Sequence, residues 1–325
     1  MSRPAGTPHA ERRPQPAAEE LAERILGGAP AAVARGITWC EEGGEQAERL
    51  LDLLPPVTVP VLGLTGPPGA GKSTLVNVVV RHYRAAGRTV GVLAVDPTSP
   101  LTGGALLGDR IRLEGVSGDP GVFFRSLASR GAQGGLSDAT RRAVRVLGAA
   151  GFDEVIVETV GAGQSQVDIM RLADTVVVVM IPGAGDEMQA LKAGIMEIAD
   201  VFACNKADLP GLDELKSHLS ALIHLLPRTS WRPPVVETVA SMGKGIDELL
   251  AAVAEHRSHQ STGAGAQRHT AALASEVEHL AQLAFRRAIL AERAQVLVEL
   301  ASSTLTEQEA VVELARRSAR RLLTE

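Results

Sequence analysis

One segment, Gly66–Ser73 with the sequence GPPGAGKS, limits what this chain can fold into more than any other feature. It directly follows an apolar, β-branched run and opens a helical pattern, which is the context that gives GxxxxGK[ST] its meaning. Glycines let backbone N–H groups curve around a phosphate, and the N-terminus of the following helix adds positive dipole potential. The sequence therefore predicts a phosphate-binding loop. The residues expected to contact the nucleotide here are Gly66, Pro67, Pro68, Gly69, Ala70, Gly71, Lys72, Ser73 and Thr74.

Two side chains of this loop are expected to carry chemistry. Lys72 would reach the β- and γ-phosphates and act in catalysis, and the Ser73 hydroxyl would ligate Mg²⁺. A tight turn with a chance lysine is the alternative, and both spacing and context disfavour it. The additional glycine, Gly69, makes the pattern GxxGxGK[ST], which is typical of the SIMIBI class of P-loop proteins.

From residue 57 onward, short β-branched runs alternate with helical segments. Runs that are apolar on both faces predict a mostly parallel sheet with helices covering both faces, in an α/β fold. A P-loop NTPase fold is therefore expected. The expected strands are Thr58–Leu64, Thr89–Val95, Glu154–Val157, Thr175–Ile181, Val201–Cys204 and Val235–Val239.

A second motif, Asn205-Lys206-Ala207-Asp208, follows the expected strand Val201–Cys204 and matches NKxD, the guanine-recognition pattern. The aspartate would accept from the N1–H and N2–H₂ groups of guanine, and the lysine stem would cover the ring. Adenine would leave the Asp208 carboxylate unpaired, which costs roughly 1–3 kcal/mol or more. Ser241-Met242-Gly243, after the next strand, is the candidate for the remaining guanine-side loop, although Met242 departs from the usual alanine. GTP is the expected nucleotide.

A carboxylate-containing loop, Glu158-Thr159-Val160-Gly161, ends another buried run and matches the [D/E]xxG pattern of a second switch. Glu158 would bind Mg²⁺ directly or through water, and the Gly161 amide would sense the γ-phosphate. Asp96 and Asp109 are further candidates for the shell of the metal. A solvated loop acid is the alternative for each carboxylate. Ala162 stands where Ras-like enzymes place the glutamine that orients water, so slow intrinsic hydrolysis is predicted.

The chain is expected to divide into four segments. Residues 1–17 form a Pro/Ala/Arg-rich disordered tail, 18–56 an N-terminal segment of three short helices, 57–259 the GTPase domain, and 260–325 a linker with a C-terminal helical arm. In the arm a long helix is expected over about His269–Ser302 and a second from Thr306, with the capping box Thr306…Glu309. The arm would either pack on its own domain or dimerise the protein.

Composition excludes several other classes of protein. The formal net charge is −5 and aromatic residues make up 2 % of the chain, so neither a basic field nor a base-stacking platform for nucleic acid is present. Two isolated cysteines, Cys40 and Cys204, indicate buried thiols and no disulfide framework. The N-terminus lacks an apolar signal core, and no apolar stretch is long enough to span a membrane. We expect a cytoplasmic protein.

Four longer strings point to a family. VDPTSP (Val95–Pro100) and TGGALLGDR (Thr102–Arg110) resemble VDPSSP and TGGSLLGDR; ETVGAGQS (Glu158–Ser165) resembles ETVGVGQS; PGAGDEMQ (Pro182–Gln189) resembles PGAGDELQ. Through about residues 57–250 the chain resembles the methylmalonyl-CoA-mutase-associated GTPases, the MeaB/ArgK group. The resemblance implies a homodimeric GTPase that uses GTP and Mg²⁺ as chaperone of an adenosylcobalamin-dependent acyl-CoA mutase, with the adenosylcobalamin belonging to the mutase.

The resemblance also implies roles for particular residues. Ser73, Asp96, Asp109 and Glu158 would handle Mg²⁺, and Gly185–Lys192 would correspond to a third switch that carries the nucleotide state to the mutase. The polar residues of that relay are Asp186, Glu187, Gln189 and Lys192. A second stretch that varies in the family is Phe124–Gly131.

Two other functions compete with the mutase chaperone. A metal-delivery GTPase of the nickel or cobalt type would need a Cys/His cluster, and among the eight histidines only His256 and His259 are suitably spaced on one helix. A kinase of amino-acid-transport binding proteins, an older assignment in this family, would need an acceptor site for which the sequence gives no signal.

Overall fold

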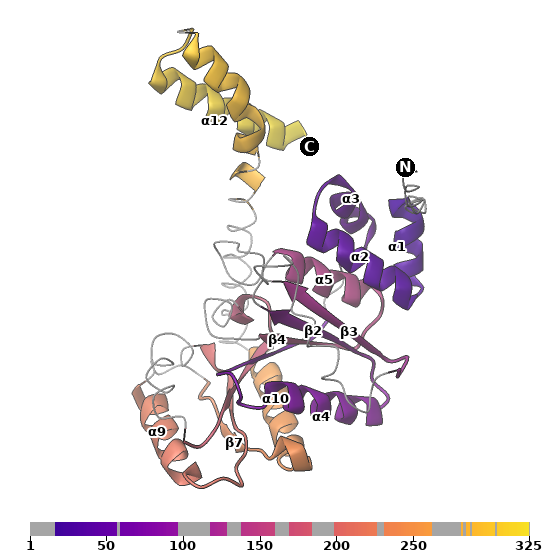
Figure 1. The fold of residues 1–325 in the computed structure, drawn as a ribbon, viewed down its shortest axis with the longest axis vertical. Coiled ribbons are helices and arrows are strands. Elements are labelled where there is room, and N and C mark those ends of the chain that lie inside the picture. Colours follow the sequence, from indigo (N-terminus) through magenta and orange to yellow (C-terminus); the bar gives the residue numbers. More distant parts are fainter. Residues whose placement is uncertain are drawn as a thin grey trace, which may run out of the picture. The chain divides into compact units, whose positions relative to one another are not determined.

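The computed structural model describes residues 17–56, 59–96, 118–128, 138–159, 169–183, 198–225, 231–261 and, with gaps at 282–283, 287 and 303, residues 281–324. Its centre is a seven-stranded sheet of order β3-β2-β4-β1-β5-β6-β7, in which every neighbouring pair is parallel (Figure 1). The strands are β1 (Val61–Thr65), β2 (Val90–Asp96), β3 (Val122–Ala128), β4 (Glu154–Thr159), β5 (Thr175–Met180), β6 (Val201–Cys204) and β7 (Val235–Glu237).

Helices cover the sheet on both faces, as the doubly apolar runs predict. One face packs against α4 (Lys72–Ala85) and α10 (Ile246–Gln260), with Leu62, Ile156 and Val177 pointing toward them. The other face packs against α5 (Asp138–Ala149) and α9 (Leu212–Leu225), with Val155, Val157 and Val176 in that core. The α/β P-loop fold expected from the sequence is confirmed.

The six expected strands are present with small shifts at their ends, and one strand was missed. The missed strand, β3 (Val122–Ala128), pairs with β2 along its whole length at one edge of the sheet. Most of its residues are only partly buried. The run VFFRSLA also carries an arginine and a serine, so it lacks the continuous apolar character by which the central strands were identified.

Three aspartates accept backbone N–H groups at the amino end of the sheet. Each immediately precedes its own strand (β4, β5 or β6) and accepts from the adjacent strand or from the residue just before that strand. Asp174 accepts from Val61 (2.7 Å), Asp200 from Val176 (2.9 Å) and Asp153 from Thr89 (2.7 Å). These carboxylates satisfy donors that would otherwise be left open where the ladder begins.

The N-terminal helices α1 (Ala18–Leu26), α2 (Pro30–Glu42) and α3 (Glu45–Leu53) pack on α5 and contribute to the same core (Figure 1). Polar contacts fix this arrangement. The Arg125 guanidinium on β3 pairs with Glu41 (2.6 Å) and donates to the Thr38 hydroxyl (3.1 Å), and Arg145 donates to the carbonyls of Leu51 and Leu54. Part of the variable stretch Phe124–Gly131 therefore anchors the N-terminal helices.

The chain divides into two compact units, Met1–Arg257 and Ser258–Glu325. In the second unit a helix over residues 288–301 pairs with α12 (Glu307–Thr324) through Arg317, which donates to both carboxylate oxygens of Glu299 at 2.9 Å. The capping box is confirmed: Thr306 N–H donates to Glu309 (2.9 Å), and Glu309 N–H donates to the Thr306 hydroxyl (3.3 Å). The expected boundaries of the four segments stay predictions.

Both cysteines are free and buried, as expected. Burial raises the pKa of Cys40 to about 12 and that of Cys204 to about 11. Across the described ranges, no helix has the length and apolarity needed to cross a membrane.

Candidate nucleotide-binding site

The phosphate loop runs from the end of β1 to the start of α4, at the carboxyl end of the sheet. Two of its glycines are required by their surroundings. Gly66 has φ 144°, and a Cβ there would stand 2.2 Å from the Val179 carbonyl oxygen; Gly71 has φ 85°, and its Cβ would stand 2.5 Å from Asn205 Nδ2. Any larger residue at either position would displace the loop from the strand or from Asn205.

The Lys72 ammonium is held inside this loop. Its Nζ donates to the carbonyl oxygens of Gly66 and Pro67, each at 2.9 Å, and the side chain is buried. The cation is thereby fixed beside the backbone amides at the start of α4. A phosphate group entering the loop would meet both the ammonium and the helix N-terminus.

The Ser73 hydroxyl and the Glu158 carboxylate meet across two elements. Ser73, on the first turn of α4, donates to Glu158 Oε1 at 2.7 Å, and Glu158 is 3 % exposed near the end of β4. The two are brought together because β4 lies beside β1, with Glu158 opposite Leu64. A hydroxyl and a carboxylate are hard oxygen donors of the kind that Mg²⁺ takes together with substrate phosphates. These residues fit a magnesium ion, which Ser73 and Glu158 would hold.

Asn205 connects three parts of the site. Its Nδ2 donates to the Ala70 carbonyl of the phosphate loop (2.8 Å), and its Oδ1 accepts from the Thr238 hydroxyl (3.2 Å) and the Ala240 amide (3.1 Å). The side chain is buried. Asn205 therefore ties the loop at β1 to the segment that follows β7, and its role here is to hold the site together.

Lys206 and Asp208 lie at the rim, beyond the end of β6. Lys206 has φ 55° and is the one residue other than glycine with positive φ in the described part of the chain. Such a backbone conformation costs about 1–3 kcal/mol, and residues that adopt it cluster at binding and active sites. Lys206 is partly buried and Asp208 is exposed. The exposed Asp208 carboxylate is accessible to a nucleotide base.

The segment after β7 differs in detail from the sequence-based expectation. Ser241, Met242 and Gly243 are exposed, and Met242 is 63 % exposed. Thr238 and Ala240, which were not singled out, make the contacts to Asn205. The sequence does place a threonine and a small residue directly after the last strand. Their contacts with Asn205 could not be predicted, because Asn205 lies 33 and 35 residues earlier in the chain.

The chain is similar in sequence and in structure to known proteins. A family model described as methylmalonyl Co-A mutase-associated GTPase MeaB matches residues 33–294, which covers the sheet and the whole of the site. The chain belongs to the MeaB family. A protein of Pyrococcus abyssi whose name assigns it to the GTPases is 52 % identical over 245 residues, spanning 74 % of this chain and 76 % of that protein.

Other members of the MeaB family and related proteins are also similar. The GTPase ArgK of Escherichia coli is 35 % identical over 73 % of this chain and 75 % of its own length. A mouse protein named methylmalonic aciduria type A homolog, mitochondrial, is 37 % identical over 63 % of this chain and 50 % of its length. A crystal structure of a LAO/AO transport system kinase superposes with a TM-score of 0.63 at 28 % identity, covering 92 % of this chain and 96 % of that one.

As a member of the MeaB family the chain binds guanine nucleotide and hydrolyses GTP to GDP and phosphate. Several residues expected to take part cannot be placed. Asp96 ends β2, but its side chain is not described. The remaining expected residues, Asp109, Gly161, Asp186, Glu187, Gln189 and Lys192, lie outside the described residues.

The histidine considered for metal binding has another role. His256 is buried on α10, where its Nδ1 contacts the Thr175 hydroxyl (2.9 Å) and its Nε2 lies 3.1 Å from Asp200. The Trp231 ring packs 4.9 Å from the imidazole, centroid to centroid. Within the described ranges, no group of three His, Cys, Asp or Glu side chains could hold a metal ion.

Proposed function

We propose that this MeaB-family GTPase is a Mg²⁺-dependent chaperone of an adenosylcobalamin-dependent acyl-CoA mutase, either methylmalonyl-CoA mutase or a close relative. The observation that carries the proposal is the match of residues 33–294 to the mutase-associated GTPases. The name of the mouse relative, methylmalonic aciduria type A homolog, supports the same partner class. In this role the GTPase gates loading of the cofactor and protects or reactivates the mutase. Adenosylcobalamin is bound by the mutase, not by this chain.

In hydrolysis, the chain's own groups position the triphosphate. Lys72 would bind the β- and γ-phosphates, and Ser73 and Glu158 would hold Mg²⁺, which would supply positive charge against the phosphate oxygens. Asp96 and Asp109 contribute to the metal's outer shell, and the Gly161 amide senses the γ-phosphate. The base lies against Asn205, Lys206 and Asp208, with Ser241–Gly243 alongside.

Hydrolysis by the isolated protein is slow in this proposal. The residue after Gly161 is Ala162, which has no polar group to orient the attacking water. A partner that completes the site would raise the rate. The relay to that partner is the segment with Asp186, Glu187, Gln189 and Lys192, next to the end of β5 in the sequence.

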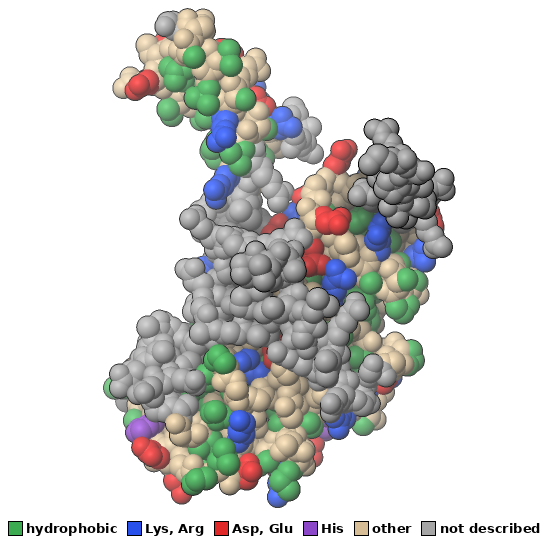
Figure 2. Space-filling view, viewed as in Figure 1, with side chains coloured by type: hydrophobic (Ala, Val, Ile, Leu, Met, Phe, Trp, Pro, Cys, Tyr) green, Lys and Arg blue, Asp and Glu red, His purple; other side chains and the backbone are tan. Residues whose placement is uncertain are grey.

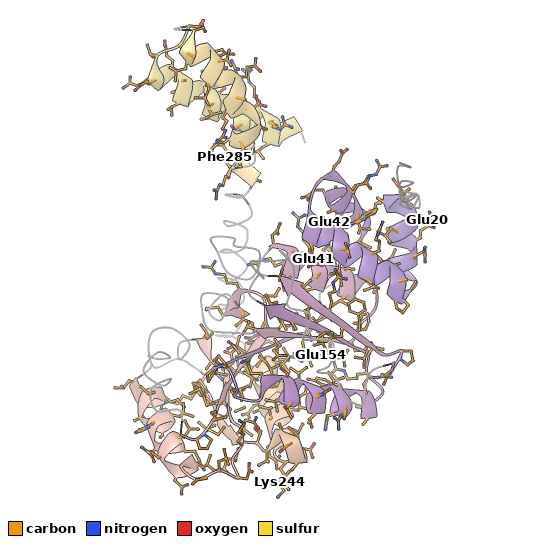
Figure 3. The ribbon with its side chains drawn as sticks, viewed as in Figure 1. Glu20, Glu41, Glu42, Glu154, Lys244 and Phe285 are labelled. Atoms are coloured by element: carbon orange, nitrogen blue, oxygen red, sulfur yellow. The ribbon has the colours of Figure 1, made fainter. Side chains whose placement is uncertain are left out.

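The protein is a homodimer in this proposal, formed through the C-terminal unit. The described helices of that unit expose large apolar side chains, visible as hydrophobic residues on its surface in Figure 2. Phe285, labelled in Figure 3, is 38 % exposed, and Val298 and Val311 are each 69 % exposed. Exposed apolar area of this kind is typical of an interaction surface, and an antiparallel helical pair with such faces suits a second copy.

A direct test is to load the protein with GDP or a non-hydrolysable GTP analogue and measure binding to a purified adenosylcobalamin-dependent mutase by calorimetry. We expect binding whose affinity differs between the two nucleotide states, and a rise in GTP turnover on adding mutase. A Lys72→Ala variant, which should bind both nucleotides more weakly, is the matched control. Absence of binding to methylmalonyl-, isobutyryl- and ethylmalonyl-CoA mutases in both states would defeat the proposal.

Two alternatives remain to be separated experimentally. Metal delivery is disfavoured because His256, the more promising of the paired histidines, is already bonded to Thr175 and Asp200 in the core. A kinase is suggested by the name of the structurally similar LAO/AO transport system kinase. Incubation with GTP labelled on the γ-phosphate tests the kinase: label on a protein supports a kinase, and free phosphate alone supports a GTPase.

A further inference from the structure

A buried pair of threonines lies directly beneath the nucleotide site. Thr65 is the last residue of β1 and Thr159 the last of β4, and the Thr159 hydroxyl donates to Thr65 Oγ1 at 2.9 Å. Neither side chain has any exposed surface. Thr65 directly precedes Gly66 of the phosphate loop, and Thr159 directly follows Glu158.

The neighbours of this pair along the sheet are apolar. The register places Val95 of β2 beside Thr159 and Val178 of β5 beside Thr65, so one row across four strands reads Val, Thr, Thr, Val. Valine has nearly the shape of threonine and a stronger preference for buried strands, so two valines would fill this space without any polar group. The two hydroxyls gain little net stability from each other, since each had to leave water. Stabilisation of the fold alone therefore does not explain why these two positions carry hydroxyl groups.

The pair and the Ser73–Glu158 contact hold the end of β4 from opposite faces. Glu158 points toward α4, on the face where Ile156 packs, and accepts from Ser73 at 2.7 Å. Thr159 points to the other face, where Val155 and Val157 pack, and is bonded to β1. Two successive residues are thus tied to the two elements that flank the phosphate loop.

We propose that Thr65 and Thr159 are positioning residues for Mg²⁺-dependent GTP hydrolysis. Their hydrogen bond fixes the end of β4 against the start of the phosphate loop, which sets the position of the Glu158 carboxylate relative to Ser73. This inference rests on the proposed magnesium role of Ser73 and Glu158. A carboxylate displaced by a fraction of an ångström would bind the ion less well, and misplacement of about 1 Å can cost 100-fold in rate.

The test replaces both hydroxyls by methyl groups in the full-length protein. The double variant Thr65→Val/Thr159→Val leaves no unpaired hydroxyl, so its Tm should stay close to that of the wild type. Mg²⁺ should increase the affinity of the protein for a fluorescent GDP analogue. We expect the Mg²⁺ concentration that gives half of this increase to rise about tenfold in the double variant. We also expect kcat for GTP to fall on the order of tenfold with KM little changed. GDP affinity in EDTA should change least.

Thr175→Val is the matched control, because Thr175 is an equally buried threonine of the same sheet at its opposite end, bonded to His256. It should lower Tm and leave the Mg²⁺ titration and kcat of the folded protein unchanged. If the double variant does not fold, Thr159→Ser and Thr159→Val replace it. Thr159→Ser should lose more stability than Thr159→Val, yet keep the wild-type Mg²⁺ dependence. Thr159→Val should show the shift to higher Mg²⁺ concentration.

Wild-type Mg²⁺ dependence and kcat in the double variant would overturn the positioning role, as would a shift equal to that of Thr175→Val. Failure of the underlying function gives a different result. If the wild-type protein binds GDP and hydrolyses GTP equally well with and without Mg²⁺, then the assignment of Ser73 and Glu158 is wrong, whatever the threonine variants do.

Discussion

The contacts of buried charged side chains differ between the two ends of the parallel sheet. At the amino end, Glu154 (labelled in Figure 3) has no exposed surface and is paired with Arg88 (3.2 Å) and Arg257 (3.0 Å). His256 is paired with Asp200 there. At the carboxyl end, Lys72 is bonded to the neutral carbonyls of its own loop, and Glu158 to a hydroxyl. These contacts join opposite charges at the amino end, whereas those at the carboxyl end join Lys72 and Glu158 to carbonyl and hydroxyl groups.

This difference separates structural from functional charge within one strand. Glu154 and Glu158 both belong to β4 and both face α4; Glu154 pairs with the guanidinium groups of two arginines, and Glu158 accepts from the Ser73 hydroxyl. The Lys72 ammonium and the Glu158 carboxylate, bonded to the phosphate loop and to Ser73, lie where a phosphate and a metal ion are expected. We therefore expect substitutions at the carboxyl end to affect function and those at the amino end to affect stability.

The largest effect should come from Lys72→Ala. Loss of the ammonium should lower GTP turnover on the order of 100- to 1,000-fold, since it removes charge stabilisation of the phosphates, while Tm changes by only a few degrees. Turnover and thermal unfolding are measured on the same preparations. Lys216→Ala is the control, because Lys216 is an exposed lysine that pairs with Glu237 on the surface. A Lys72→Ala protein with near-normal turnover would contradict the functional role assigned to the carboxyl end of the sheet.

The sequence allowed the carboxyl end to be predicted better than the amino end. The phosphate loop and NKxD are contiguous motifs, so Lys72, Ser73 and Asn205 could be found without knowing the fold. The contacts of Asn205 with Thr238 and Ala240, and those of Arg257 with Glu154, join segments far apart in the chain, and no local pattern marks them. The aspartates that precede β4, β5 and β6 are a local signal, but their partners lie on neighbouring strands.

The next largest effect is expected at the amino end, from Glu154→Gln. Removing this carboxylate leaves Arg88 and Arg257 without their buried counter-charge, which should destabilise the protein by about 3 kcal/mol. For a unit of this size the shift in Tm is roughly 6–12 °C. Turnover per folded molecule should stay at the wild-type value when assayed well below Tm. A Glu154→Gln protein of normal stability but reduced turnover would reverse the assignment of the two ends.

Asp208→Asn should change specificity with little change in stability. An amide at this exposed position offers a donor where the carboxylate accepts, so guanine affinity should fall about tenfold to a hundredfold, corresponding to roughly 1–3 kcal/mol. Xanthine, whose 2-position carries an oxygen in place of the amino group, should gain affinity. Displacement of a fluorescent GDP analogue by GTP and by XTP measures both affinities. Equal loss of both nucleotides would mean that Asp208 acts through the fold of the loop and not on the base.

The smallest effect concerns the pH dependence of stability at the amino end. Hydrogen bonds from the Thr89 amide and hydroxyl lower the pKa of Asp153 below its usual value of 3.8. Because the folded-state pKa lies below the unfolded one, the unfolded chain binds the proton more readily, so this contribution is full above about pH 4 and is lost as pH falls through the folded pKa. Asp153→Asn should therefore cost less than about 1 kcal/mol at pH 7, since the group is largely solvated. Urea unfolding from pH 7 down to pH 3 should show the two proteins converging, and a difference that grows toward low pH would contradict the assigned sign.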